Sequence, residues 1–152
     1  MKIQKIIYTA IVFAENPFAK SFGKRGFERF VGSGYPNRFC HHVTIQFGFQ
    51  TTDLPEYIGE YPEFEVHEIR KDDNAVAAFG HVTICSSSLR EAMEGVNQHL
   101  TIATAENIKP VYCKDMTGEV VHTFGWPYFQ AYGRCGAFVV FDDNTTGWVF
   151  EK

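Results

Sequence analysis

The sequence predicts a mixed α/β domain in which a strand–helix–strand unit occurs twice, each unit closing on a His-x-Thr motif. Six segments carry this pattern, in the order strand, helix, strand, strand, helix, strand: 6–14, 16–31, 40–48, 75–85, 86–98 and 99–104. In the closing segment of each unit, apolar side chains alternate with polar ones, which is typical of a strand with one face in the core.

The composition favours one domain over residues 1–152. Apolar residues make up 45% of the chain and aromatic residues 16%, which is typical of a globular protein with a core. No apolar run is long enough to cross a membrane. The net charge of −4 argues against a protein that binds long duplex nucleic acid through contacts with its phosphates. Residues 1–40, however, carry seven Lys and Arg against two Glu, which suits a small phosphate-bearing ligand.

The cysteines favour reduced thiols and a cytoplasmic location, which is the host cytoplasm if a phage encodes the protein. They are widely spaced and form no CxxC pair, which argues against a zinc site built on thiolates: Cys40, Cys85, Cys113 and Cys135. The segment at 6–14 follows two lysines, as a signal-peptide core would, but its β-branched composition favours a first strand.

Capping patterns predict the two helices. Asn16 is the expected N-cap of the first helix and Pro17 its first residue, whereas Gly23 weakens the helix further along. Ser88, with Glu91 three residues later, forms a capping box that is expected to open the second helix.

The remaining segments are read from alternation and turn residues. Residues 51–63 are irregular, and 64–70 alternate as a strand. Residues 137–150 are expected to form a hairpin that turns between Asn144 and Gly147.

The polar residues of the two closing strands are the strongest functional signal. In 40–48, alternation places Val43, Ile45 and Phe47 on one face, and His42 with Thr44 on the other. His99 and Thr101 share a face of 99–104 in the same way. If the two units pack as related halves, these four polar side chains face each other across one groove.

Two imidazoles and two hydroxyls in one groove suit the cleavage of a phosphodiester. One neutral histidine takes the proton of the attacking hydroxyl, and the other, protonated, gives a proton to the leaving oxygen. The threonine hydroxyls hold the non-bridging oxygens. Which of His42 and His99 is the base stays open, and no metal or cofactor is required.

A third His-x-Thr motif competes with this pair. His81 and Thr83 have the same alternation, but they lie on the strand that opens the second unit and do not correspond to His42. His81 is therefore interpreted as structural. His41 is expected to pack or hydrogen-bond locally, while His67 and His122 show no partner pattern and are interpreted as structural or exposed residues.

The segments "HHVTIQFG" and "HLTIATAENIKP" resemble the paired H-x-T motifs of the 2H phosphoesterase superfamily. That superfamily includes bacterial RNA cyclic phosphodiesterases, a domain of tRNA ligases, and phage anti-CBASS nucleases. The resemblance spans roughly residues 6–110, with a shorter spacing between the motifs than is usual. It implies a bilobal α/β fold with a central groove and metal-independent phosphodiester cleavage. It also implies that His42 and His99 are the acid and base and that Thr44 and Thr101 are phosphate ligands.

Other residues are candidates for substrate contacts. Tyr8 on the first strand is expected to line the groove, and Lys109, just after the second motif, is placed to reach a phosphate. Four aromatic residues of the C-terminal third are candidates for stacking on a nucleobase: Trp126, Tyr128, Tyr132 and Trp148.

The main hypothesis is a phosphodiesterase acting on a small nucleotide, either a cyclic oligonucleotide or an RNA end with a 2′,3′-cyclic phosphate. The first alternative is a nucleotide-binding module of the same fold without turnover. The second is a metal-dependent hydrolase that uses His41, His42 or other histidines as ligands. The lack of carboxylates or thiols at ligand spacing argues against this second alternative. The sequence leaves the linkage, the oligomeric state and the biological role open.

Overall fold

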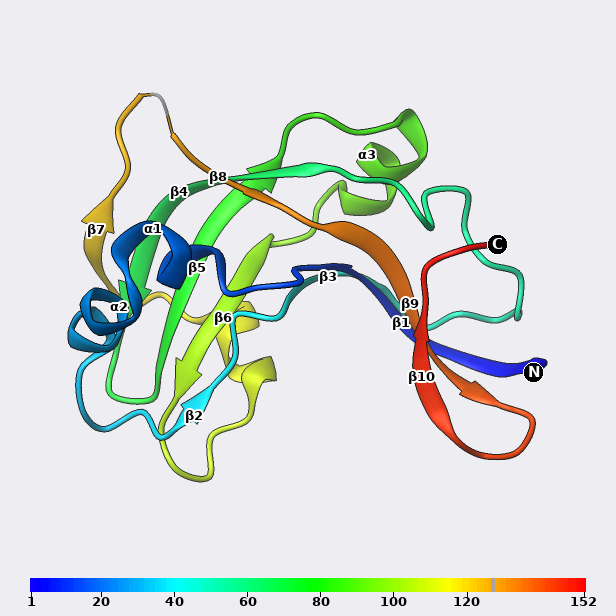
Figure 1. The fold of residues 1–152 in the computed structure, drawn as a ribbon, viewed down its shortest axis with the longest axis horizontal. Helices are drawn as coiled ribbons and strands as arrows, with labels where there is room; N and C mark the ends of the chain where they lie inside the picture. Colours follow the sequence, from blue (N-terminus) through cyan, green and yellow to red (C-terminus); the bar gives the residue numbers. More distant parts are fainter. Residues whose placement is uncertain (127) are drawn as a thin grey trace.

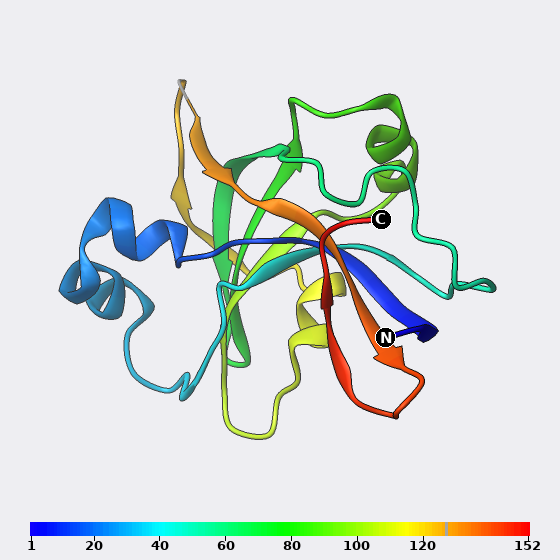
Figure 2. The same cartoon turned by 45° about the vertical axis from the view of Figure 1, so that its right-hand side comes forward.

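A computed structural model of the chain describes residues 1–126 and 128–152 and confirms a mixed α/β fold dominated by one antiparallel sheet (Figures 1 and 2). In the described residues the elements are, in chain order, β1 (Ile3–Val12), α1 (Pro17–Phe22), α2 (Lys24–Val31), β2 (Asn37–Arg38), β3 (His42–Phe47), β4 (Glu63–Lys71), β5 (Ala75–Val82), α3 (Ser87–Met93), β6 (His99–Thr104), the 3-10 helix η1 (Pro110–Asp115), β7 (Glu119–Thr123), β8 (Phe129–Tyr132), β9 (Arg134–Phe141) and β10 (Thr146–Val149).

The two strand–helix–strand units meet at the middle of the sheet. The main path runs β10-β9-β1-β3-β6-β5-β4-β7, while β2 pairs with β6 and β8 pairs with β4. The first unit opens with β1 and closes with β3, and the second opens with β5 and closes with β6. The two closing strands are therefore neighbours, each flanked by the opening strand of its own unit.

One face of these central strands is in the core. Val43 and Ile45 of β3 are buried, as are Leu100 and Ile102 of β6. β6 has the predicted bounds, and the strand interpretation of 6–14 is confirmed by β1, which pairs with both β3 and β9. Burying such side chains contributes roughly 1.5–3 kcal/mol each, so the alternation holds both strands in the register that leaves their polar residues on the other face.

The first predicted helix is divided into two. The Asn16 side chain accepts hydrogen bonds from the backbone N–H groups of Phe18 and Ala19, which confirms the predicted N-cap. Gly23 adopts a φ of 76°, a conformation that few other residues tolerate, and it separates α1 from α2.

The prediction for the start of α3 was wrong by two residues. The N-cap is Ser86, whose hydroxyl accepts from the N–H of Leu89, so Ser88 lies inside the first turn. The helix ends at Met93 because Glu94 is extended and Gly95 has a φ of 75°. The predicted helix to residue 98 is therefore a shorter helix followed by a loop that leads into β6.

The C-terminal hairpin forms as predicted, with its turn slightly earlier. β9 and β10 are joined by residues 142–145, where Asn144 has a φ of 67° and the Asp143 carboxylate accepts from the N–H of Thr145. Gly147 belongs to β10 instead. β9 pairs with β1 over the length of that strand, and both chain ends lie at the same end of the sheet, away from α1 and α2 (Figure 1).

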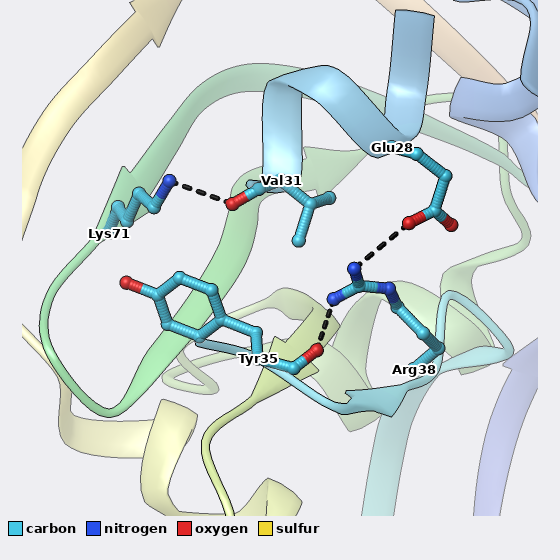
Figure 3. A network of polar contacts seen from close by, with 5 residues as sticks. All are labelled: Glu28, Val31, Tyr35, Arg38 and Lys71. Carbon is cyan, nitrogen blue, oxygen red and sulfur yellow. Dashed lines mark hydrogen bonds and ion pairs between the residues drawn. The ribbon is translucent and has the colours of Figure 1, made fainter. Parts of the chain in front are cut away.

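Polar contacts fasten α2 to the sheet, as Figure 3 shows. The Lys71 Nζ of β4 donates to the carbonyl oxygen of Val31 at 2.8 Å and lies over the Tyr35 ring. Arg38 of β2 donates to the Glu28 carboxylate at 2.9 Å and also to the Tyr35 carbonyl. These contacts hold the end of α2 between β2 and β4.

Within the part of the chain that the structure describes, no helix combines the length and the apolar character needed to cross a membrane.

Candidate functional site

The pairing of β3 with β6 brings the two His-x-Thr motifs together. The strands are antiparallel, with Val43 opposite Leu100. The four motif residues flank this pair, one on either side of it along each strand, and alternation directs their side chains to the face opposite Val43 and Leu100: His42, Thr44, His99 and Thr101.

A pocket of about 790 Å³ opens over this join of the two strands, and His42, Thr44, His99 and Thr101 all line it. Tyr8 of β1 lines it too, as expected. The loop after α3 contributes Gly95, Val96 and Asn97, and η1 contributes Pro110, Val111, Lys114 and Asp115. The volume lies within the range of roughly 300–1,000 Å³ found for small-molecule sites.

His42 is half-buried, and its environment keeps the imidazole neutral. Burial, together with the neighbouring His41 and His99, lowers the pKa of His42 from its ordinary value of 6.5 to about 4. The Nδ1 atoms of His41 and His42 lie 3.1 Å apart, and the Tyr8 ring packs against His42 with 5.4 Å between centroids. At neutral pH His42 is therefore neutral, and its Nε2 is the basic nitrogen in the tautomer whose Nδ1–H donates to the Nδ1 of His41.

An irregularity before β3 explains how neighbouring residues 41 and 42 touch. β2 pairs with β6 in one register and β3 in another, with two extra residues on the β2–β3 side. Cys40 has a φ of 67° and its N–H donates to the Thr101 carbonyl. Such a bulge redirects side chains, so His41 joins the pocket beside His42 instead of lying behind it.

His99 is oriented by the backbone. Its Nδ1 lies 2.9 Å from the carbonyl oxygen of Asn97, and because a carbonyl oxygen only accepts, Nδ1 carries the proton. Its Nε2 is then the nitrogen available to a ligand. Phe79, opposite His99 in the β5–β6 pairing, packs against the ring at 6.0 Å between centroids.

The two threonines differ in burial. Thr44 is half-buried, whereas Thr101 is only 9% exposed. Burial raises the pKa of the Cys113 thiol, and a hydrogen bond with the Thr101 side chain opposes that shift. Because Cys113 belongs to η1, this short helix supports the Thr101 hydroxyl from the rim of the pocket.

Gln46 is a pocket residue that was missed in the sequence. The Tyr57 hydroxyl donates to the Gln46 Oε1 at 3.1 Å and itself contacts the Thr9 hydroxyl at 2.8 Å. Burial raises the Tyr57 pKa to about 12, so this phenol stays protonated and keeps donating. With its oxygen occupied, Gln46 has its amide N–H groups free for a ligand. Alternation gave no clear signal for it, because the irregularity in the β1–β3 pairing changes the phase of β3 between Thr44 and Gln46.

The basic residue of the pocket is Lys114, in place of the expected Lys109. Lys109 precedes η1 and is exposed outside the lining, whereas the turns of η1 bring Lys114 and Asp115 to the pocket. Asn97 donates to the Lys114 carbonyl at 2.7 Å, which ties the loop after α3 to η1.

Aromatic side chains gather at the β1 side of the pocket. Phe47, which alternation placed in the core, is 64% exposed and lines the pocket next to Tyr8. The bulge at Thr9 and Ala10 in the β1–β3 pairing shifts the register there. Among the four C-terminal aromatic candidates, Trp148 packs within 5.7 Å of the His41 ring and 6.1 Å of the His42 ring. Trp148 therefore packs behind these two histidines without lining the pocket itself, and the other three candidates also lie outside the lining: Trp126, Tyr128 and Tyr132.

The third His-x-Thr motif lies outside the pocket. His81 is exposed at the end of β5 and directly opposite Glu65 of β4. His67, for which the sequence showed no partner, contacts both: its Nε2 lies 2.8 Å from Glu65 Oε1, and its ring centroid lies 4.4 Å from that of His81. These contacts agree with the interpretation of His67 as a structural residue.

No protein-family model, curated protein or solved structure matches this chain. The chemistry of the site is therefore argued from its own residues.

Proposed function

We propose that this protein is a metal-independent phosphodiesterase that cleaves a small nucleotide phosphodiester, either in a cyclic oligonucleotide or in a 2′,3′-cyclic phosphate. The observation that carries the proposal is the antiparallel join of β3 and β6, which groups His42, Thr44, His99 and Thr101 around one pocket. Two imidazoles with separate surroundings are what proton transfer at both ends of a phosphodiester requires.

In this proposal His42 is the base and His99 the acid. The lowered pKa keeps His42 neutral, and with its Nδ1–H donated to His41, its Nε2 accepts the proton of the attacking hydroxyl as that oxygen bonds to phosphorus. The bond from phosphorus to the leaving oxygen breaks, and protonated His99 supplies a proton to that oxygen from Nε2. With a 2′,3′-cyclic substrate the attacking group is water, and with a 3′–5′ linkage it is the adjacent 2′-hydroxyl.

The remaining polar side chains stabilise the phosphate. The hydroxyls of Thr44 and Thr101 donate to its non-bridging oxygens, where negative charge develops in the transition state. Lys114 supplies a positive charge at the rim, and the Gln46 amide adds a further donor.

The rest of the pocket favours a small nucleotide over long RNA. Much of the lining is apolar, which suits a nucleobase or a sugar face: Phe39, Ile45, Phe47, Val96, Pro110 and Val111. Tyr8 and Phe47 lie side by side with 5.4 Å between ring centroids and offer a surface for base stacking. The net charge of −4 is unfavourable for long polyanions.

The bilobal arrangement of the 2H phosphoesterase superfamily belongs to the same proposal. Its support is the order of the central strands, β1-β3-β6-β5, in which each half presents its closing strand to the other. The motif residues follow the same order, since on each strand a histidine and a threonine flank the one pair that joins the halves, Val43 with Leu100.

The test is turnover in excess chelator. Purified protein is incubated with 2′,3′-cyclic mononucleotides and with a panel of cyclic di- and trinucleotides, beside His42→Ala, His99→Ala and His81→Ala variants. We expect product from at least one substrate, abolished in the first two variants and retained in the third. Equal turnover in all four proteins would sink the two-histidine mechanism. Saturable binding without product would instead identify a nucleotide-binding module.

A further inference from the structure

We propose that Glu65, His67 and His81 bind one divalent transition-metal ion, for which zinc is the best fit. Each of the three side chains offers one ligand atom, and these atoms all lie within 4.8 Å of one another. The site takes in the third His-x-Thr motif, which the phosphodiesterase pocket leaves unused. It does not depend on the proposed phosphodiesterase activity.

Strand pairing builds this metal site. Glu65 and His81 are directly opposite in the antiparallel β4–β5 pair, so their side chains leave the sheet on the same side. Further along, Val66 is opposite Gly80 and Glu68 is opposite Phe79, so His67 is an extra residue in a bulge. The bulge turns the His67 ring toward Glu65 and His81.

Gly80 lets the two strands approach closely enough. A Cβ atom at this position would lie 1.8 Å from the Glu65 carbonyl oxygen and 3.0 Å from the Val66 Cα. Only glycine permits this close approach. Gly80 directly precedes His81 and is opposite Val66, the residue that follows Glu65. The absence of a side chain at Gly80 thereby brings the two strands of the metal site together.

The three ligand types suit zinc. Two imidazole nitrogens and a carboxylate oxygen form a common zinc set, with water as the fourth ligand. Tetrahedral zinc with bonds of about 2.1 Å needs ligand atoms roughly 3.4 Å apart. Glu65 and His67 are already within 2.8 Å, and the exposed His81 side chain has the freedom to close the remaining gap.

The surroundings of the three ligands favour a metal ion that links β4 to β5. Tyr128 packs on the His67 ring at 4.6 Å between centroids and restricts its motion, while Glu65 is 13% exposed in its side chain. None of the three ligands lines the pocket of His42 and His99. An ion here joins β4 to β5, and β5 carries Phe79 against His99, so it stabilises the half of the sheet that supports the pocket.

The experiment is a calorimetric titration with zinc chloride of full-length protein that has been stripped with chelator and dialysed. We expect one zinc ion per chain and a melting temperature that rises with zinc concentration. His67→Ala and His81→Ala should each weaken binding by at least about tenfold, and Glu65→Gln, which keeps the side-chain shape, should weaken it too. His122→Ala, which removes an exposed histidine on β7, is the matched control and should bind as the unaltered chain does.

Folding and binding are separated by melting each variant in chelator. Variants that melt near the unaltered protein in chelator, yet gain no stability from zinc, support the site. No saturable binding at one ion per chain would overturn it. So would full affinity in His67→Ala and His81→Ala, or loss of binding in His42→Ala in their place. Because the titration uses no turnover, its failure leaves the phosphodiesterase proposal standing, and the reverse also holds.

Discussion

Two histidine clusters lie on neighbouring strands of the same sheet, and their surroundings give them different chemistry. His42 and His99 sit in a pocket with hydroxyls and aromatic rings, where burial lowers the pKa of His42 to about 4. His67 and His81 lie outside it and face a carboxylate, Glu65. His42 and His81 each begin the same tetrapeptide, "HVTI", so the motif by itself does not decide the role. The neighbours across the strand decide it.

The largest expected effect is on turnover and separates the clusters directly. His42→Ala or His99→Ala should each lower kcat by about 10²–10⁴-fold, because each removes a proton-transfer group. His81→Ala should stay within about threefold of the unaltered enzyme under chelator, since His81 does not line the pocket. Steady-state rates on the substrate found in the panel provide the measurement. A loss in His81→Ala as large as in His99→Ala would mean that the two clusters act as one site.

The next largest effect is expected from a backbone change at Gly80, next to the ligands of the proposed zinc site. Gly80→Ala puts a Cβ 1.8 Å from the Glu65 carbonyl, so β4 and β5 must separate, at a cost of at least about 2–3 kcal/mol. Urea unfolding measures this change, and zinc titration should show weakened binding in the same variant.

A matched substitution is Gly26→Ala in α2. Its added Cβ meets the Phe22 Cβ at an ordinary 3.6 Å, and alanine should stabilise the helix by about 0.5–1 kcal/mol. Equal effects of the two alanines on unfolding would contradict the close strand contact at Gly80.

A third prediction concerns the pH dependence of stability that arises from His42. The pKa of His42 is lowered from 6.5 in the unfolded chain to about 4 in the fold, so the unfolded state binds the proton first. Its contribution to stability is complete above pH 6.5 and is lost as the pH falls toward 4, by at most roughly 3 kcal/mol. His42→Gln removes this dependence. Urea unfolding of both proteins from pH 7.5 to 4 should show the unaltered protein losing up to roughly 3 kcal/mol relative to the variant, whereas a constant difference would contradict the lowered pKa.

The smallest expected effect tests the support of the pocket. Tyr57→Phe removes the hydroxyl between Thr9 and Gln46, which leaves a buried Thr9 hydroxyl without that partner and should cost about 1–2 kcal/mol of stability. It also releases the Gln46 amide, so KM should rise a few-fold with little change in kcat. Rate measurements beside Thr9→Val separate these two effects, because that variant leaves the contact of Tyr57 with Gln46 in place.

Local patterns in the sequence predicted most of the elements. β6 begins and ends where the alternation does, Asn16 caps α1, and Asn144 lies in the turn of the last hairpin. The error at α3 is instructive: Ser86 and Ser88 are chemically equal as caps, and the choice between them depends on which phase buries Leu89 and Met93. That choice belongs to tertiary packing.

The sequence predicted well which types of residue form the candidate site, and less well which individual residues line it. His42, Thr44, His99, Thr101 and Tyr8 meet at the pocket as expected, whereas Lys114 takes the position expected for Lys109. The Glu65-x-His67 alternation on a predicted strand was visible, but its partner His81 lies across the sheet and could be matched only once the register of β4 and β5 was known.

The sequence by itself determined which residues alternate, and hence which polar side chains leave the core, because side-chain direction along a strand follows from local backbone geometry. Only the tertiary structure decided which strands became neighbours. Backbone hydrogen bonds are the same for every strand pair, so the neighbours are selected by the packing of side chains far apart in the chain. That packing set β3 against β6, and it separated the histidines of the pocket from those opposite Glu65.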